Sequence, residues 1–185
     1  MYSGDGVWRD LDRSLADILA AKGMNVVGVD VLRYYWNEIP PAKAASDLAR
    51  ILRHYQSRWS CSRIVLIGFS FGADVLPFMA SRLPADLKAQ VGLITLLSPE
   101  RTTAFEVEMN GWLGGKPKAG TPIGPEVKKL TGIQVQCIYG TDEADASLCT
   151  DSTAGTLTVL AKSGGHHFDK NYGELADEIL AAAPK

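Results

Sequence analysis

One stretch of the chain decides the fold, and it reads Arg63-Ile64-Val65-Leu66-Ile67-Gly68-Phe69-Ser70-Phe71-Gly72. Its first part is a run of aliphatic residues that ends at a glycine, which predicts a buried β-strand, and apolar residues at helical spacing follow from 73 to 83. The five residues from Gly68 to Gly72, between the predicted strand and the predicted helix, have the form Gly-x-Ser-x-Gly. In a strand-to-helix turn this pattern is typical of a nucleophile elbow. Such a turn forces its serine towards positive φ and leaves no room for side chains two residues to either side. We therefore expect the Ser70 hydroxyl to be a nucleophile at the end of a strand.

The rest of the chain alternates between strand and helix patterns. Helical spacing of apolar residues predicts helices over 8–22, 42–59 and 172–183, and aliphatic runs predict strands over 25–31, 91–97, 132–139 and 156–160. Residues 102–125 are rich in glycine and proline and have no sustained period. Five or six strands separated by helices predict an α/β fold, with a mostly parallel sheet and helices on both of its faces.

Composition restricts the class of protein. The chain has 185 residues, of which 46% are hydrophobic and 22% charged, so we expect a single domain over residues 1–185 with its own core. A net charge of −2 and scattered basic residues argue against nucleic acid as a partner. No apolar run is long enough for a transmembrane segment, and no signal-peptide pattern opens the chain. Because it opens on a loop with almost no strand before it, we expect a domain excised from a longer protein.

An acid and a base follow the serine in the order that α/β-hydrolases use, each on a loop after a strand. The loop after the strand at 132–139 holds Asp142, Glu143 and Asp145, and the loop after the strand at 156–160 holds His166 and His167. A general base must reach the serine hydroxyl and must be held in one tautomer by a carboxylate. We therefore predict an α/β-hydrolase fold without a large cap domain and a Ser-acid-His triad.

Two members of this triad have alternatives. For the base we prefer His166, which directly follows two glycines, with His167 as the alternative. For the acid we prefer Asp145, because an apolar residue follows it three positions later, with Glu143 as the alternative. Asp142 is a third, weaker choice that could simply cap the loop.

The oxyanion hole requires two backbone N–H donors. The residue after the nucleophile, Phe71, supplies one of them. The loop Ser3-Gly4-Asp5-Gly6 lies where the second donor is expected, and we assign it to the N–H of Asp5. The same loop could instead cap the first helix.

The cysteines leave two interpretations open. Cys137 lies in a predicted strand and Cys149 twelve residues later, so a disulfide between them would suit an oxidising compartment. Three unpaired cysteines in a cytosolic protein explain the spacing equally well. No C-x-x-C or H-x-x-x-H pair is present, so we expect no metal site, and we expect no cofactor.

Five segments together resemble the VirJ/AcvB family of bacterial virulence-associated α/β-hydrolases: 2–8, 30–36, 68–74, the acid loop from Tyr139 to Cys149, and 164–168. The resemblance covers nearly the whole chain. It implies a periplasmic serine hydrolase that, in the AcvB branch, cleaves lysyl-phosphatidylglycerol, and it implies secretion-system proteins as partners. For an exported protein it also favours the Cys137–Cys149 disulfide.

A lysyl ester is cationic, so its ammonium requires a nearby anion. Several carboxylates are expected beside the triad, and among them we assign substrate contacts to Asp74 and Asp169. Trp112, in the glycine-rich segment that is long enough to cover the site, is the third expected contact, because aromatic side chains on such a segment can repack against acyl chains. The alternative functions are a general carboxylesterase and a non-catalytic binding module that assists secretion.

Overall fold

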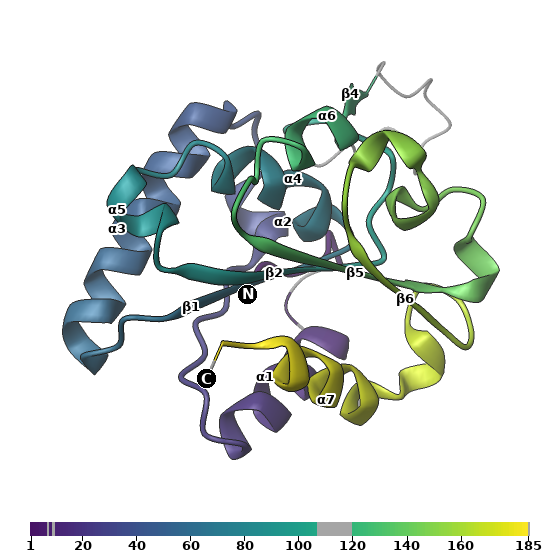
Figure 1. The fold of residues 1–185 in the computed structure, drawn as a ribbon, viewed down its shortest axis with the longest axis horizontal. Helices are drawn as coiled ribbons and strands as arrows, with labels where there is room; N and C mark the ends of the chain where they lie inside the picture. The colour runs from purple at the N-terminus through teal and green to yellow at the C-terminus, as the bar shows by residue number, and fades with distance from the viewer. Residues whose placement is uncertain (7, 9, 107–119, 185) are drawn as a thin grey trace.

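The main sheet of the computed structural model has four parallel strands (Figure 1). They lie in the order β1 (Ile64–Phe69), β2 (Val91–Leu97), β5 (Gln134–Gly140) and β6 (Thr158–Lys162). The structure describes residues 1–6, 8, 10–106 and 120–184. Since parallel strands end at the same edge of a sheet, the loops after β1, β2, β5 and β6 gather along one edge.

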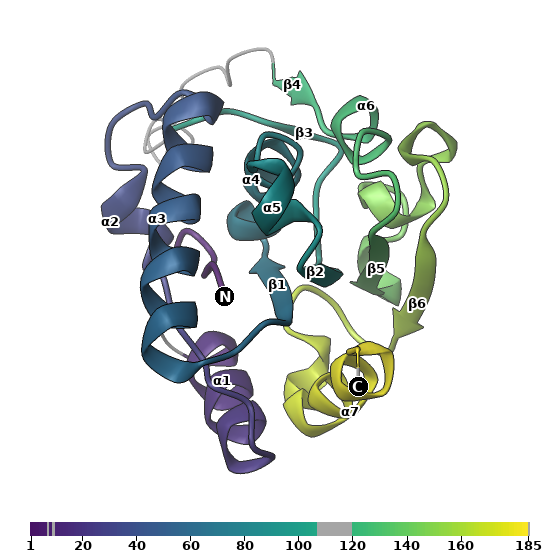
Figure 2. The same ribbon diagram turned by 60° about the vertical axis from the view of Figure 1, so that its left-hand side comes forward.

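Helices cover both faces of this sheet (Figures 1 and 2). On one face lie α1 (Leu11–Ala21) and α7 (Tyr172–Ala182), and on the other lie α3 (Pro41–Trp59), α4 (Phe71–Ala80), α5 (Ala85–Lys88) and α6 (Gly124–Val127). The four-residue α2 (Val31–Tyr34) precedes α3, and a short antiparallel pair joins β3 (Thr102–Thr103) to β4 (Thr121–Pro122). The predicted α/β-hydrolase class, a parallel sheet between two helical layers, is confirmed.

Each helical layer buries its own half of the core. Leu11, Leu15 and Leu19 recur at helical spacing on α1 and pack with Leu175 and Ile179 of α7 under one face of the sheet. α4 is buried along almost its whole length, because it lies between α3 and the sheet. Burial on both faces explains why the central strands β1 and β2 are nearly continuous runs of aliphatic residues.

The predicted strand over 25–31 is wrong. These residues are irregular except for an isolated bridge between Val29 and Tyr2, and Val31 already begins α2. Strand character requires a ladder of hydrogen bonds to a neighbour, and among the described residues Tyr2 is the one bridge partner of this segment. The main sheet therefore has four strands within the described ranges, where the sequence pattern predicted five or six.

The other predicted elements appear near their predicted positions. β2 has the predicted bounds, whereas the ends of β1, β5 and β6 are displaced by one or two residues. Within the described part of the chain, no helix is long and apolar enough to cross a membrane.

Candidate active site

The Ser70 turn has the geometry of a nucleophile elbow. Ser70 directly precedes α4, with φ 51° and ψ −125°, and its N–H donates to the Leu97 carbonyl at 2.9 Å. A Cβ on Gly68 would lie 2.5 Å from the Gly72 carbonyl oxygen, and a Cβ on Gly72 would lie 2.4 Å from that of Ser3. Both glycines are therefore required by close backbone contact, and the left-handed φ of Ser70 places it in a strained conformation typical of functional turns.

The acid and base loops meet because their strands are neighbours. β5 and β6 pair in parallel up to Gly140 and Lys162, so the turn Thr141–Glu143 and the loop carrying His166 leave the sheet side by side. A Cβ on Gly140 would lie 2.3 Å from the Gly165 carbonyl oxygen, so only glycine allows this approach. His166 Nδ1 lies 2.9 Å from Glu143 Oε1 and 3.1 Å from Glu143 Oε2.

The structure thus brings Glu143 to His166, where Asp145 was the preferred acid. Thr141–Glu143 forms a 3-10 turn, and the Glu143 carbonyl then accepts hydrogen bonds from the N–H groups of Ala146 and Ser147. This tight turn aims the Glu143 side chain at the base loop and leaves Asp145 exposed on the outside. Which carboxylate reaches His166 depends on the shape of the turn, which the residue spacing did not reveal.

His166 is the better placed of the two histidines. Its carbonyl accepts a hydrogen bond from Ser98 Oγ at 3.3 Å, and its ring packs on Phe69 with centroids 5.1 Å apart. His167 also contacts Phe69 and is exposed, and no carboxylate lies within hydrogen-bond distance of it in the described structure. Desolvation of its ring against the neighbouring residues, and then the charge of His166, lower the pKa of His167.

Ser70 and His166 line one cavity of about 260 Å³, which we call the base cavity. His167, Asp5, Asp10 and Asp12 also line it. No hydrogen bond joins the Ser70 hydroxyl to His166 in the part of the chain that is described. Such contacts are often long without substrate and tighten only in the complex.

The two oxyanion donors assigned from the sequence lie beside Ser70. The Phe71 N–H belongs to the first turn of α4, where amide groups have no partner within the helix. Asp5 lines the base cavity together with Ser70, in an exposed turn, and Asp5 and Phe71 also line a second cavity with Ser70. Both residues therefore line a cavity that Ser70 also lines.

The second cavity, of about 190 Å³, is lined by four carboxylate residues, and we call it the acidic cavity. They are Asp5, Asp74, Glu100 and Glu106, and no lysine or arginine lines it among the described residues. Asp74 is buried, and its Oδ1 accepts a hydrogen bond from the Glu100 N–H at 2.8 Å. Burial raises the pKa of Asp74 well above its ordinary value, and the charges of Glu100 and Asp5 raise it further.

The three residues that were expected to contact the substrate have three different outcomes in the structure. Asp74 lines the acidic cavity beside Ser70. Asp169 is exposed, lies against Gly164 and lines neither cavity, and Trp112 lies outside the described residues. Glu106, Asp10 and Asp12 were not anticipated, because the first lies in the segment without periodicity and the others look like the polar start of a helix.

Cys137 and Cys149 form a disulfide with their Cα atoms 5.4 Å apart, so the pairing favoured by the resemblance is confirmed. It joins β5 to the segment that follows the acid turn. Cys61 is a free cysteine. Among the described residues no group of three or more His, Cys, Asp or Glu side chains is arranged to hold a metal ion.

Comparisons with known proteins agree with the fold. The chain matches the family model "VirJ: Bacterial virulence protein (VirJ)" over residues 1–185. MenH from S. aureus superposes with a TM-score of 0.67 at 12% identity, covering 98% of this chain and 91% of that one. The esterase domain of a Rhodothermus marinus protein gives 0.62 at 11% identity, with 98% and 82% coverage. An extracellular α/β-hydrolase from a Paenibacillus species gives 0.60 at 10% identity, with 100% and 98% coverage. No curated protein matches in sequence.

Proposed function

Since this chain belongs to the VirJ family of bacterial virulence proteins and has an α/β-hydrolase fold resembling that of esterases, we propose that it is a serine hydrolase that cleaves a carboxylic ester. The observation that carries the proposal is the pairing of Glu143 with Nδ1 of His166, which lines the base cavity together with Ser70. A carboxylate on Nδ1 fixes the tautomer that leaves Nε2 free to accept a proton from the serine.

The reaction proceeds through an acyl-enzyme. His166 Nε2 takes the proton of Ser70 as Oγ attacks the ester carbonyl, and the carbonyl oxygen becomes an oxyanion held by the N–H groups of Phe71 and Asp5. The C–O bond to the leaving alcohol breaks as the imidazolium gives that alcohol its proton. Water then attacks the acyl-enzyme with His166 as base, releasing the acid and free Ser70. Glu143 stabilises the imidazolium in both halves.

The two cavities suggest which part of the ester lies where. The leaving alcohol must lie beside His166, because that residue protonates it, so the base cavity suits the alcohol. The acyl group then extends into the acidic cavity, which Ser70 and Phe71 line but His166 does not. An acyl group with a positive charge suits this cavity, since four carboxylate residues line it and one of them, Asp74, is buried.

We therefore propose an aminoacyl ester as substrate, with the lysyl ester of phosphatidylglycerol as the first choice. Its ammonium groups would enter the acidic cavity near Asp74, whose buried carboxyl a cation would return to the charged form. Such a substrate belongs to a membrane surface, so we also propose a periplasmic location and a role beside secretion-system proteins. A general carboxylesterase is the closest alternative, and the acidic cavity is the observation against it.

The test of catalysis compares three variants on a soluble ester. Ser70→Ala and His166→Ala should each lower kcat by about 10⁴-fold or more with unchanged circular dichroism, because the triad acts as a unit. His167→Ala should retain activity within about tenfold. Retention of more than a tenth of the activity by Ser70→Ala would instead favour a non-catalytic binding module.

The test of the substrate compares a lysyl ester with its alanyl analogue. Ion pairing should make the lysyl ester react faster at low salt, and the preference should shrink as salt screens the charges. Glu100→Gln, which removes a charge from the acidic cavity but none from the triad, should weaken the same preference. Equal rates on both esters would leave a general carboxylesterase.

A further inference from the structure

Ser3 is a buried polar residue at the start of the loop that carries the second oxyanion donor. Its exposed fraction is 0%, although the loop runs on to the exposed Asp5. A hydroxyl in such a position must find its hydrogen-bond partners within the protein. Ser3 takes no part in the proton transfers of the proposed reaction, so its burial needs another explanation.

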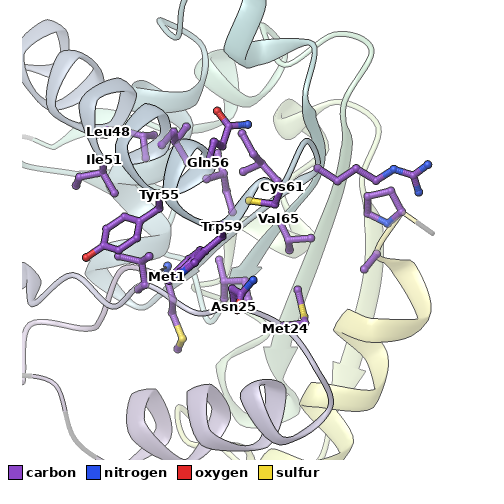
Figure 3. A pocket seen from close by; sticks show the side chains of 18 of the residues that line it. Met1, Met24, Asn25, Leu48, Ile51, Tyr55, Gln56, Trp59, Cys61 and Val65 are labelled. Atoms are coloured by element: carbon purple, nitrogen blue, oxygen red, sulfur yellow. Dashed lines mark hydrogen bonds between the residues drawn. The ribbon is translucent and has the colours of Figure 1, made fainter.

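Cavities adjoin the two neighbours of Ser3 but not Ser3 itself. An apolar cavity of about 460 Å³ lies between α3, β1 and residues 23–29, and Tyr2 is among its lining residues (Figure 3). On the other side, Gly4 lines the base cavity. Ser3 lines neither of the two, so solvent that enters them does not compete for its hydroxyl.

The Ser3 hydroxyl makes two hydrogen bonds, and the chemistry of its partners fixes their direction. The Val31 N–H donates to Ser3 Oγ at 3.0 Å, and Ser3 Oγ lies 2.9 Å from the Gly4 carbonyl oxygen. Because an amide N–H can only donate and a carbonyl can only accept, the hydroxyl accepts from Val31 and donates to Gly4. Val31 begins α2, where amide groups have no partner within the helix. The hydroxyl therefore links the start of α2 to the oxyanion loop.

The bond to the Gly4 carbonyl fixes the direction of the Asp5 N–H. These two groups belong to one peptide unit, and every described peptide bond is trans. A planar trans peptide directs its C=O and its N–H to opposite sides. While the buried Ser3 holds the carbonyl, the N–H of Asp5 must leave on the side away from Ser3. Ser3 lines neither cavity beside Ser70, whereas Asp5 lines both.

Gly4 makes this hydrogen bond important. A Cβ on Gly4 would lie 3.3 Å from the Phe69 ring and 3.4 Å from Ser70 Cβ, so the loop passes directly against the nucleophile. The same lack of a Cβ lets glycine adopt a wide range of backbone angles. The peptide after Gly4 could therefore turn over and present its carbonyl where an N–H is required. The Ser3 hydroxyl selects one of the two orientations.

We propose that Ser3 is a positioning residue for the oxyanion hole: its hydroxyl holds the Gly4 carbonyl and thereby directs the Asp5 N–H to the oxygen of the ester carbonyl. The inference rests on the proposed serine hydrolase and adds to it a residue that acts through another group. A donor that is already oriented stabilises the oxyanion fully, because nothing has to turn as the charge develops. A donor that is free to turn away loses part of that effect.

The first measurement compares kcat and KM of Ser3→Ala and the wild type on a soluble ester. Ser3→Ala should lower kcat by about 10- to 100-fold, somewhat less than the loss of a complete oxyanion donor, and leave KM within about twofold. Ser3→Cys, whose thiol is a weaker donor, should fall between the two proteins. Ser3→Cys also decides the question if Ser3→Ala does not fold, since a wild-type kcat in that variant would overturn the inference.

Thr95→Val is the matched control for the loss of a buried hydroxyl. Thr95 is 0% exposed in the middle of β2, and its Oγ1 donates to Gln136 Oε1 at 3.0 Å. This variant should lower Tm, because the buried Gln136 loses a partner, and should leave kcat within about twofold. A kcat loss in Thr95→Val as large as that in Ser3→Ala would reduce the Ser3 effect to one of stability and overturn the positioning role.

A trifluoromethyl ketone gives a second readout, which a loss of stability does not move. Ser70 Oγ adds to its carbonyl carbon, the serine proton passes to His166, and the carbonyl oxygen becomes an oxyanion that the hole must hold. The inhibition constant should rise about 10- to 100-fold in Ser3→Ala and stay unchanged in Thr95→Val. Wild-type kcat and inhibition of Ser3→Ala would overturn this inference and leave the hydrolase proposal intact. A wild-type protein that neither hydrolyses esters nor binds the ketone would overturn both.

Discussion

At the scale of single residues, the candidate site depends on where two side chains leave the sheet. Glu143 ends a 3-10 turn after β5, and His166 follows the glycines after β6, so neighbouring strands bring their side chains to within 2.9 Å. Ser70 lies in a strand-to-helix turn and lines the base cavity together with His166. Three separate loops thus supply the residues of the proposed triad.

Glu143→Gln should lower kcat on a soluble ester by about 10³- to 10⁴-fold, because a neutral amide can hold His166 in the wrong tautomer and cannot stabilise the imidazolium. Asp145→Asn, on the same loop but exposed, is the matched control and should stay within about twofold. Steady-state kinetics of the two purified variants check this. The reverse order of effects would return the acid role to Asp145.

Asp74 should make stability depend on pH. Because burial raises its pKa in the folded protein, the folded state binds more protons than the unfolded state between the ordinary pKa of 3.8 and the raised value. Stability from this group is therefore lost as pH rises through that window. Asp74→Asn keeps an oxygen acceptor for the Glu100 N–H. The unfolding free energy of this variant should therefore rise relative to that of the wild type as pH rises. Urea unfolding at several pH values measures the difference, and a difference independent of pH would contradict the assignment.

At the scale of elements, the acid turn is held at both ends. Gly140 ends β5, and after the turn Leu148 donates its N–H to the Pro99 carbonyl at 3.0 Å before Cys149 joins Cys137 in the middle of β5. The disulfide closes a loop with a sequence separation of 12 residues. It therefore restrains the segment that carries Glu143.

Reduction of this disulfide should cost about 3 kcal/mol of unfolding free energy, the amount expected for a loop of this length. Urea unfolding with and without a reductant measures it. In non-reducing denaturant only Cys61 should react with a thiol reagent, and mass spectrometry should find one modified cysteine. Modification of all three cysteines in that experiment would show that the bridge is not formed in the protein.

Elements with a strong local pattern were predictable from the sequence, and those defined by distant partners were not. The runs behind β1 and β2 and the helical spacing of α3 are local signals. Residues 25–31 carry a similar aliphatic run, yet they are not a strand, because pairing depends on a neighbour that the sequence pattern does not specify. That Glu143 and not Asp145 lies beside His166 could not be predicted for a related reason, since turn geometry decides which carboxylate faces the histidine.

At the scale of the whole molecule, the loops at one edge of the sheet carry the residues of the candidate site. The base cavity and the acidic cavity meet at Ser70 and Asp5, which line both. Acidic residues line both cavities, although the net charge of the chain is only −2. The concentration of acidic groups beside Ser70 is therefore local.

The most direct test of the hydrolase proposal is covalent labelling of the folded protein with a fluorophosphonate, followed by peptide mass spectrometry. Only a serine whose proton can be taken by a positioned base reacts quickly with such a reagent. We expect a single label on Ser70, no label on Ser70→Ala, and slow labelling of Glu143→Gln and His166→Ala. Absence of a label on the folded wild-type protein, or a label that persists in Ser70→Ala, would contradict the proposed triad.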